Sequence, residues 1–143
     1  MTRRTSLLLR LGFAALLALG AVGVITGPAF AHVTAVTINP DGDVVQPGGA
    51  TVTVSGTLTC THGSGSINVT VAQDQGQQLA TAFASIAYTC SVSQPQGWIV
   101  TAPSLLGFHG GQANVLVSVF NFSFVDGFNF IQTADTVHLH PTH

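Results

Sequence analysis

Apolar and polar residues alternate along most of the chain after residue 32, a period of two that is typical of β-strands with one buried face. In TVTVSGTLTC, residues 51–60, valine occupies positions 52 and 54 while threonine occupies positions 51 and 53. The segment SINVTVAQ, residues 66–73, alternates in the same way. Short Gly-, Ser- and Asp-rich stretches separate such segments, as expected for turns.

The pattern predicts about eight strands and no helix. The Pro- and Gly-rich stretch 39–50 is interpreted as a connection between the first two strands. We therefore expect a single domain over residues 32–143, an antiparallel, immunoglobulin-like β-sandwich of about seven or eight strands. The expected strands are residues 33–38, 51–60, 66–73, 77–84, 85–90, 98–102, 114–125 and 128–140.

Residues 114–125 and 128–140 are predicted to form a hairpin, because Asp126 and Gly127 between them suit a two-residue type I′ turn. In that register Val125 faces Phe128. One face then carries the expected core, and the other carries Val125, Phe128 and Phe130, a candidate surface for a partner or for self-association. The alternative is that the second sheet or the loop 91–97 covers this patch. The expected core face consists of Leu116, Phe120, Phe122, Phe124, Ile131, Val137 and Leu139.

Residues 1–31 have the three parts of a secretory signal peptide. Arg3, Arg4 and Arg10 precede an uncharged, mostly apolar run, and Ala29 and Ala31 form a small-residue cleavage site. The run has about 15 residues, fewer than the ~20 that span a bilayer as a helix. We therefore expect cleavage after Ala31, no retained membrane span, and an extracellular or cell-wall-associated chain.

Cleavage would change the charge balance. The precursor has a formal charge of −2, and its three basic residues all lie in the signal, whereas its five acidic residues, all Asp, lie after it. A mature chain without Lys or Arg cannot neutralise phosphates, so nucleic acid is excluded as a partner. Without Lys, Arg or Glu it also lacks most catalytic side chains, and we expect no enzyme activity.

Cys60 and Cys90 are the two cysteines of the chain. In an exported protein they are expected to form a disulfide. Closing a loop of about 30 residues should stabilise the fold by about 3–4 kcal/mol in the chain-entropy model.

The segment VSGTLTC, residues 54–60, is followed by a pattern of glycine, cysteine and tryptophan positions that covers most of residues 32–143. The residues of this pattern are Ser55, Gly56, Cys60, Gly63, Cys90 and Trp98. In this pattern the chain resembles a group of small exported proteins common in actinobacteria, which have immunoglobulin-like folds and no established activity. The resemblance implies fold and location, but no chemistry. One feature departs from antibody domains, because Trp98 follows both cysteines instead of lying between them.

Histidine is the one concentrated candidate for chemistry. His138 and His140 would lie on one face of a strand, about 6–7 Å apart, and could share Cu²⁺ or Zn²⁺. After cleavage, His32 would add an amine and an imidazole, and His143 lies near the C-terminal pair. The alternative is that these histidines are neutral polar surface residues. We expect an extracellular binding or structural module, with a glycan, a protein or a second copy as partner; the alternative is a copper- or zinc-binding protein.

Overall fold

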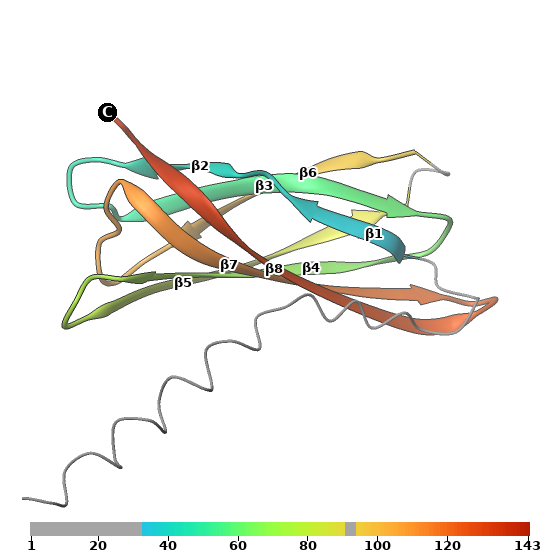
Figure 1. Cartoon of the computed structure of the whole chain (residues 1–143). Coiled ribbons are helices and arrows are strands. Elements are labelled where there is room, and N and C mark those ends of the chain that lie inside the picture. The colour runs from blue at the N-terminus through green and yellow to red at the C-terminus, as the bar shows by residue number, and fades with distance from the viewer. Residues whose placement is uncertain (1–32, 91–93) are drawn as a thin grey trace, which may run out of the picture.

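The computed structural model describes residues 33–90 and 94–143, and its regular structure there consists of strands (Figure 1). The expected signal peptide and His32 lie outside the described residues. The described part contains eight strands: β1 (Val33–Ile38), β2 (Asp41–Val45), β3 (Thr51–Cys60), β4 (Ser64–Asp74), β5 (Leu79–Thr89), β6 (Gln96–Pro103), β7 (Gly111–Ser123) and β8 (Gly127–Thr142).

The strands form one continuous network of backbone pairing. β3 pairs with β6 along one edge, and with both β1 and β2 along the other. β2 continues the network by pairing with residues 138–142 of β8, which is followed by β7, β4 and β5. Because β2 and β8 run parallel, the expectation of a purely antiparallel fold is wrong: the pairing is mixed.

The network folds over into two layers (Figure 1). β1, β2, β3 and β6 lie above β4, β5 and β7, and β8 crosses between the layers to reach β2. Alternate residues of the central strands are buried between the layers, such as Val52 and Val54 of β3 and Val117 and Val119 of β7. Each fully buried valine contributes about 1.5–3 kcal/mol of hydrophobic stabilisation.

The predicted boundaries of β1 and β3 are confirmed, but two other predictions are wrong. Residues 77–84 and 85–90 are not separate strands, because β5 runs through from Leu79 to Thr89. The segment 41–45 is a strand and not part of a connection. Its Asp-Gly-Asp sequence is typical of turns. The segment pairs with β3 at Asp43 and Val44 only, and the longer pairing, over residues 41–45, is with β8, almost one hundred residues away. The expected number of strands was reached because these two errors offset each other.

The Cys60–Cys90 disulfide is present and joins the end of β3 to the residue after β5. Nearby, Trp98 of β6 is buried and its indole N–H donates to the carbonyl of Thr57 at 3.3 Å. A Cβ at Gly56 would lie 1.9 Å from the carbonyl oxygen of Thr37 and 2.6 Å from a Trp98 ring carbon. The close approach of the β1 backbone and of the indole explains why glycine interrupts the alternation of β3.

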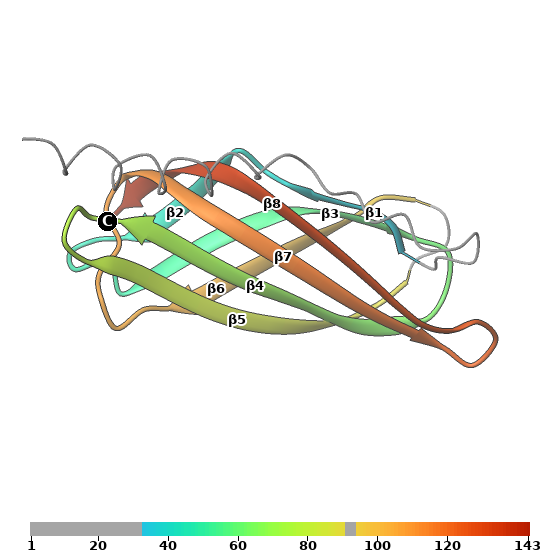
Figure 2. The same cartoon turned by 60° about the horizontal axis from the view of Figure 1, so that its bottom comes forward.

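The molecule is elongated and has two distinct ends (Figure 2). The hairpin end contains the disulfide, the β3–β4 turn and the tip of the β7–β8 hairpin, which reaches beyond the other strands. The opposite end contains the C-terminus, the β4–β5 turn and the segment 104–110.

Candidate functional site

The β7–β8 hairpin has a different register from the one predicted. Phe122 pairs with Phe128 and Ser123 with Gly127, so the loop has three residues, 124–126. Gly127 adopts a φ of 82°, the left-handed conformation that ends such three-residue hairpin loops. The prediction of a two-residue turn at Asp126 and Gly127 is therefore wrong.

The new register reverses the predicted faces of β7. Val115, Val117 and Val119 point into the core, whereas Phe120 and Phe122 point outward. The predicted core residues of β8, Val137 and Leu139, are buried as expected. Both faces of β7 are apolar in sequence, so hydrophobic alternation could not select between them and the loop length decided the outcome.

The outward side chains form an exposed apolar surface at the hairpin end, which we call the aromatic face. Phe124 is 98% exposed and Phe128 is 65% exposed. The predicted patch of Val125, Phe128 and Phe130 belongs to this surface, and the described residues leave all three side chains exposed. The wrong register had assigned the other three members to the core. The aromatic face consists of Phe120, Phe122, Phe124, Val125, Phe128 and Phe130.

The rings of the aromatic face pack against one another. The ring centroid of Phe120 lies 4.8 Å from that of Phe130 and 5.7 Å from that of Phe128. Phe122 and Phe124 meet edge to face at 5.2 Å. These are favourable distances for aromatic pairs, so the surface is ordered by its own contacts.

A buried polar network supports the aromatic face from inside. Asn121 is fully buried, and its amide Nδ2 donates to the carbonyl of His62 at 3.2 Å. Its Oδ1 accepts a hydrogen bond from the Tyr88 hydroxyl at 2.8 Å. Burial raises the pKa of Tyr88 to about 12, since desolvation disfavours the phenolate.

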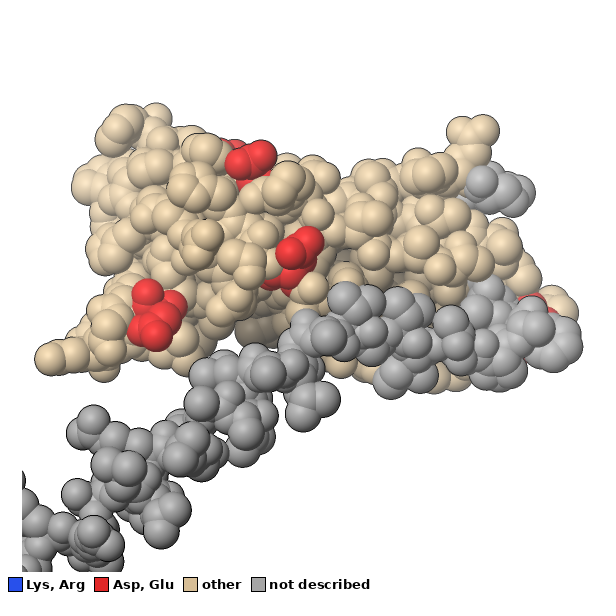
Figure 3. Space-filling view, in the orientation of Figure 1, with Lys and Arg blue, Asp and Glu red and all other residues tan. Residues whose placement is uncertain are grey.

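The loop of the hairpin is fixed by an imidazole–carboxylate contact. His62, in the β3–β4 turn, hydrogen-bonds through Nε2 to a carboxylate oxygen of Asp126. Among the described residues, Asp126 is the one carboxylate side chain at this end. The other four Asp residues lie in β2, β4 and β8, away from the hairpin tip. Figure 3 shows carboxylates scattered over the visible face and no basic side chain among the described residues.

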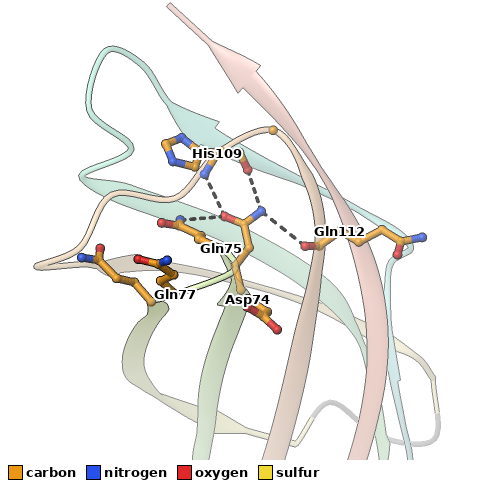
Figure 4. A pocket seen from close by; sticks show the side chains of 8 residues that line it. Asp74, Gln75, Gln77, His109 and Gln112 are labelled. Atoms are coloured by element: carbon orange, nitrogen blue, oxygen red, sulfur yellow. Dashed lines mark hydrogen bonds between the residues drawn. The ribbon is translucent and has the colours of Figure 1, made fainter.

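The opposite end carries an open cleft of about 770 Å³, lined mainly by carboxamides (Figure 4). Gln73, nearly buried, organises it: its Oε1 accepts the backbone N–H of His109 at 2.8 Å, and its Nε2 donates to the carbonyl of His109 at 2.9 Å. Gln75 donates to the carbonyl of Gly107 at 2.7 Å. These bonds hold the segment 107–112 against the end of β4.

The C-terminal histidines lie on the outer surface near the opposite end. The ring centroids of His138 and His140 are 4.8 Å apart, and His140 Nε2 lies 2.8 Å from a carboxylate oxygen of Asp41. His143 follows the end of β8 and is exposed. Within residues 33–90 and 94–143, no group of three or more His, Cys, Asp or Glu is arranged to hold a metal ion.

The structure separates these histidines from the start of β1. The backbone N–H of Val33 donates to the side chain of Asn129 near the hairpin tip, at 3.3 Å. His138 lies nine residues further along β8, which is about 30 Å at the rise of a strand. His32 lies outside the described residues, so the structure gives the position of its neighbour Val33 only, and a metal site that joins His32 to the C-terminal histidines stays an untested prediction.

The separation has a simple topological cause. Eight strands would bring the two ends together only if every connection reversed the chain direction. β1 and β2 instead run in the same direction along one edge of β3. The last strand consequently ends at the opposite end of the molecule from the start of β1.

No family model matches this chain, and no curated protein is similar to it in sequence. In the part of the chain that the structure describes, no helix has the length and apolar character to cross a membrane.

Proposed function

We propose that this chain is an exported, non-catalytic binding module that holds its partner on the aromatic face. The two facing layers, the parallel pairing of β2 with the last strand and the disulfide support an immunoglobulin-like β-sandwich as the scaffold. The signal-like residues 1–31 and the disulfide support an extracellular or cell-wall location.

The exposure of six adjacent apolar side chains is the observation that carries the proposal. Scattered single apolar residues are normal on a protein surface, whereas a contiguous and self-packed patch marks an interaction site. The hairpin is held by a disulfide-bonded end and a buried amide, so the face is presented on a rigid support. Aromatic residues are enriched in the centres of such interfaces.

The test is the double substitution Phe128→Ser with Phe130→Ser. Two readouts are needed: the free energy of unfolding, and binding, measured as co-sedimentation with insoluble cell-wall peptidoglycan and as self-association. We expect a stability loss of about 1–2 kcal/mol, because Phe128 is 65% and Phe130 is 42% exposed and both rings contact Phe120, together with weaker binding. The matched control is Phe83→Ser on β5, a phenylalanine that is 60% exposed and lies outside the aromatic face.

Loss of several kcal/mol of stability in the double variant would show that the face is structural. Unchanged binding in both assays would equally contradict the proposal.

A second candidate function is copper or zinc binding by the pair His138 and His140. The contact between their rings favours it, but the pair offers only two imidazoles on an open surface. We therefore propose at most weak binding there.

A further inference from the structure

The aromatic face has the size of one side of a protein–protein interface. Its exposed fractions, on the scale of 150–250 Å² per aromatic side chain, correspond to about 600–700 Å² of open apolar surface. The largest apolar patch of a typical monomer has about 300–600 Å². A specific interface buries about 800 Å² on each partner, so covering this face and its margin would bury the area that a stable dimer needs.

The chemistry of the face matches a copy of itself. Its six side chains are entirely apolar, and the nearby charge of Asp126 is in contact with His62 of the same chain. The chain has no Lys or Arg after residue 10 with which to attract an acidic partner. A second copy of this chain would present an apolar surface and would need no complementary charge.

The arrangement of the side chains also suits a two-fold contact. Phe120 faces Phe130 and Phe122 faces Phe128 across the hairpin, so the two strands contribute equal pairs to the same sheet face. A two-fold interface uses the same patch on both subunits. Two such faces can stack with their sheets about 10 Å apart, as sheets do inside proteins.

Polar residues border the aromatic rows. Ser66 lies opposite Phe120 and Ser64 lies opposite Phe122 on the neighbouring strand β4. At the end of the rows away from the hairpin tip, Gln132 donates to the Ser118 hydroxyl at 3.0 Å. An apolar centre with a polar border is the usual anatomy of a protein interface.

These features favour a protein surface over a sugar or a lipid. Phenylalanine has no polar group for the hydroxyls of a glycan, unlike tyrosine and tryptophan. Four of the six side chains lie on the flat part of the strands, and only Phe124 and Val125 lie at the loop where insertion into a bilayer would begin.

We infer that the partner of the aromatic face is a second copy of this chain, packed face to face in a two-fold dimer. The inference rests on the proposed function, because it names the occupant of the same surface.

The experiment is sedimentation equilibrium of the exported chain from about 5 to about 500 µM, the range in which a small interface associates. We expect the average mass to rise toward that of a dimer. Phe128→Ser with Phe130→Ser should raise the dissociation constant at least about tenfold, whereas Phe83→Ser should change it less than about twofold. Thermal unfolding checks that each variant keeps the fold. In NMR spectra of the unsubstituted chain, dilution should shift amide signals of the hairpin tip and of residues 64–66.

A monomer at every concentration, or a dimer insensitive to the double substitution, would overturn the inference. If the monomer instead co-sediments with phosphatidylcholine vesicles or peptidoglycan through Phe128 and Phe130, the second copy is wrong while the proposed function stands. If the monomer binds neither and the double variant melts far below the parent, both proposals fail.

Discussion

Each end of this molecule is held by a buried side-chain amide, but the surface of one end is apolar and that of the other is polar. At the hairpin end a buried amide, Asn121, ties the β3–β4 turn to β5; at the opposite end a nearly buried amide, Gln73, ties the segment 107–112 to β4. The hairpin end adds a disulfide and exposes phenylalanines. The opposite end is joined by hydrogen bonds and lined by glutamines.

The difference suggests a division of roles. The exposed phenylalanines of the hairpin end contribute little hydrophobic stabilisation to the core. The disulfide at the same end offsets this by lowering the entropy of the unfolded chain. The end held by hydrogen bonds has its own apolar anchor, Phe108, which is fully buried. A Cβ at Gly49, where φ is 59°, would lie 2.0 Å from the Phe108 carbonyl oxygen. A glycine in the left-handed conformation therefore allows the backbone at Phe108 to pack directly against residue 49.

Removing the disulfide should have the largest effect and should weaken the contrast between the ends. We expect Cys60→Ala with Cys90→Ala to lower the free energy of unfolding by about 3–4 kcal/mol, mainly through the entropy of the unfolded chain. Urea titration measures it, and reduction of the unsubstituted protein should give a similar loss. A loss below about 1 kcal/mol would mean that the hairpin end does not depend on its cross-link.

Removing either amide should lower the free energy of unfolding by a similar amount, but each removal should destabilise a different segment. Asn121→Ala and Gln73→Ala each leave buried backbone groups without their partners, and we expect each to cost about 2–3 kcal/mol. Hydrogen exchange should accelerate in residues 61–63 for the first variant and in residues 107–112 for the second. Acceleration at both ends in either variant would contradict the independence of the two networks.

Tyr88 gives the hairpin end a dependence on alkaline pH that the other end lacks. Its pKa of about 12 lies above the ordinary value of 10 because burial favours the neutral phenol. This group therefore contributes its full stability below pH 10, the unfolded value, and loses it as pH rises toward 12.

Urea titrations at about pH 9 and about pH 11.5 should show the loss in the unsubstituted chain. Tyr88→Phe should be less stable by about 1 kcal/mol at the lower pH, through the missing bond to Asn121, and should lose less on alkalinisation. Tyr88 is the single tyrosine of the chain, so phenolate absorbance reports its titration directly. A midpoint at its ordinary value would contradict the burial argument.

Metal addition should have the smallest effect and should not connect the ends. We expect Cu²⁺ to bind weakly at the C-terminal histidines, and His138→Ala to reduce that binding. An extra Gly in front of a chain that begins at His32 should leave this C-terminal binding unchanged, because Val33 and His138 are about 30 Å apart. EPR spectra report the Cu²⁺ ligands. Tight one-to-one binding that the added Gly abolishes would show that the N-terminal histidine is a ligand.

Local patterns in the sequence predicted much of the fold. Alternation identified β1 and β3 with their observed bounds, and the two cysteines predicted the disulfide. What failed depended on distant or unusual partners. β2 pairs with β3 at two positions only, and most of its pairing is with residues 138–142, which no local pattern shows.

The candidate surface was predicted in part for a related reason. Val125, Phe128 and Phe130 were placed outside, but three further aromatic residues were placed inside, since both faces of β7 are apolar. Asn121 and Ser123 favoured the wrong assignment, because polar residues are expected on the outer face of a strand, whereas both side chains are buried. The network that satisfies Asn121 is formed by the β3–β4 turn and β5, and it exists only in the folded chain.

The pairing of β2 with the end of β8 also has a consequence for how the chain folds. Asp41 and His138 are neighbours in space but are 97 positions apart, and folding slows as such non-local contacts come to dominate. The upper layer and the lower layer are joined along this edge only when ribosomal synthesis has reached Thr142. Until then β2 is paired only with β3, through Asp43 and Val44, and its other edge is the last edge of the pairing network to be closed.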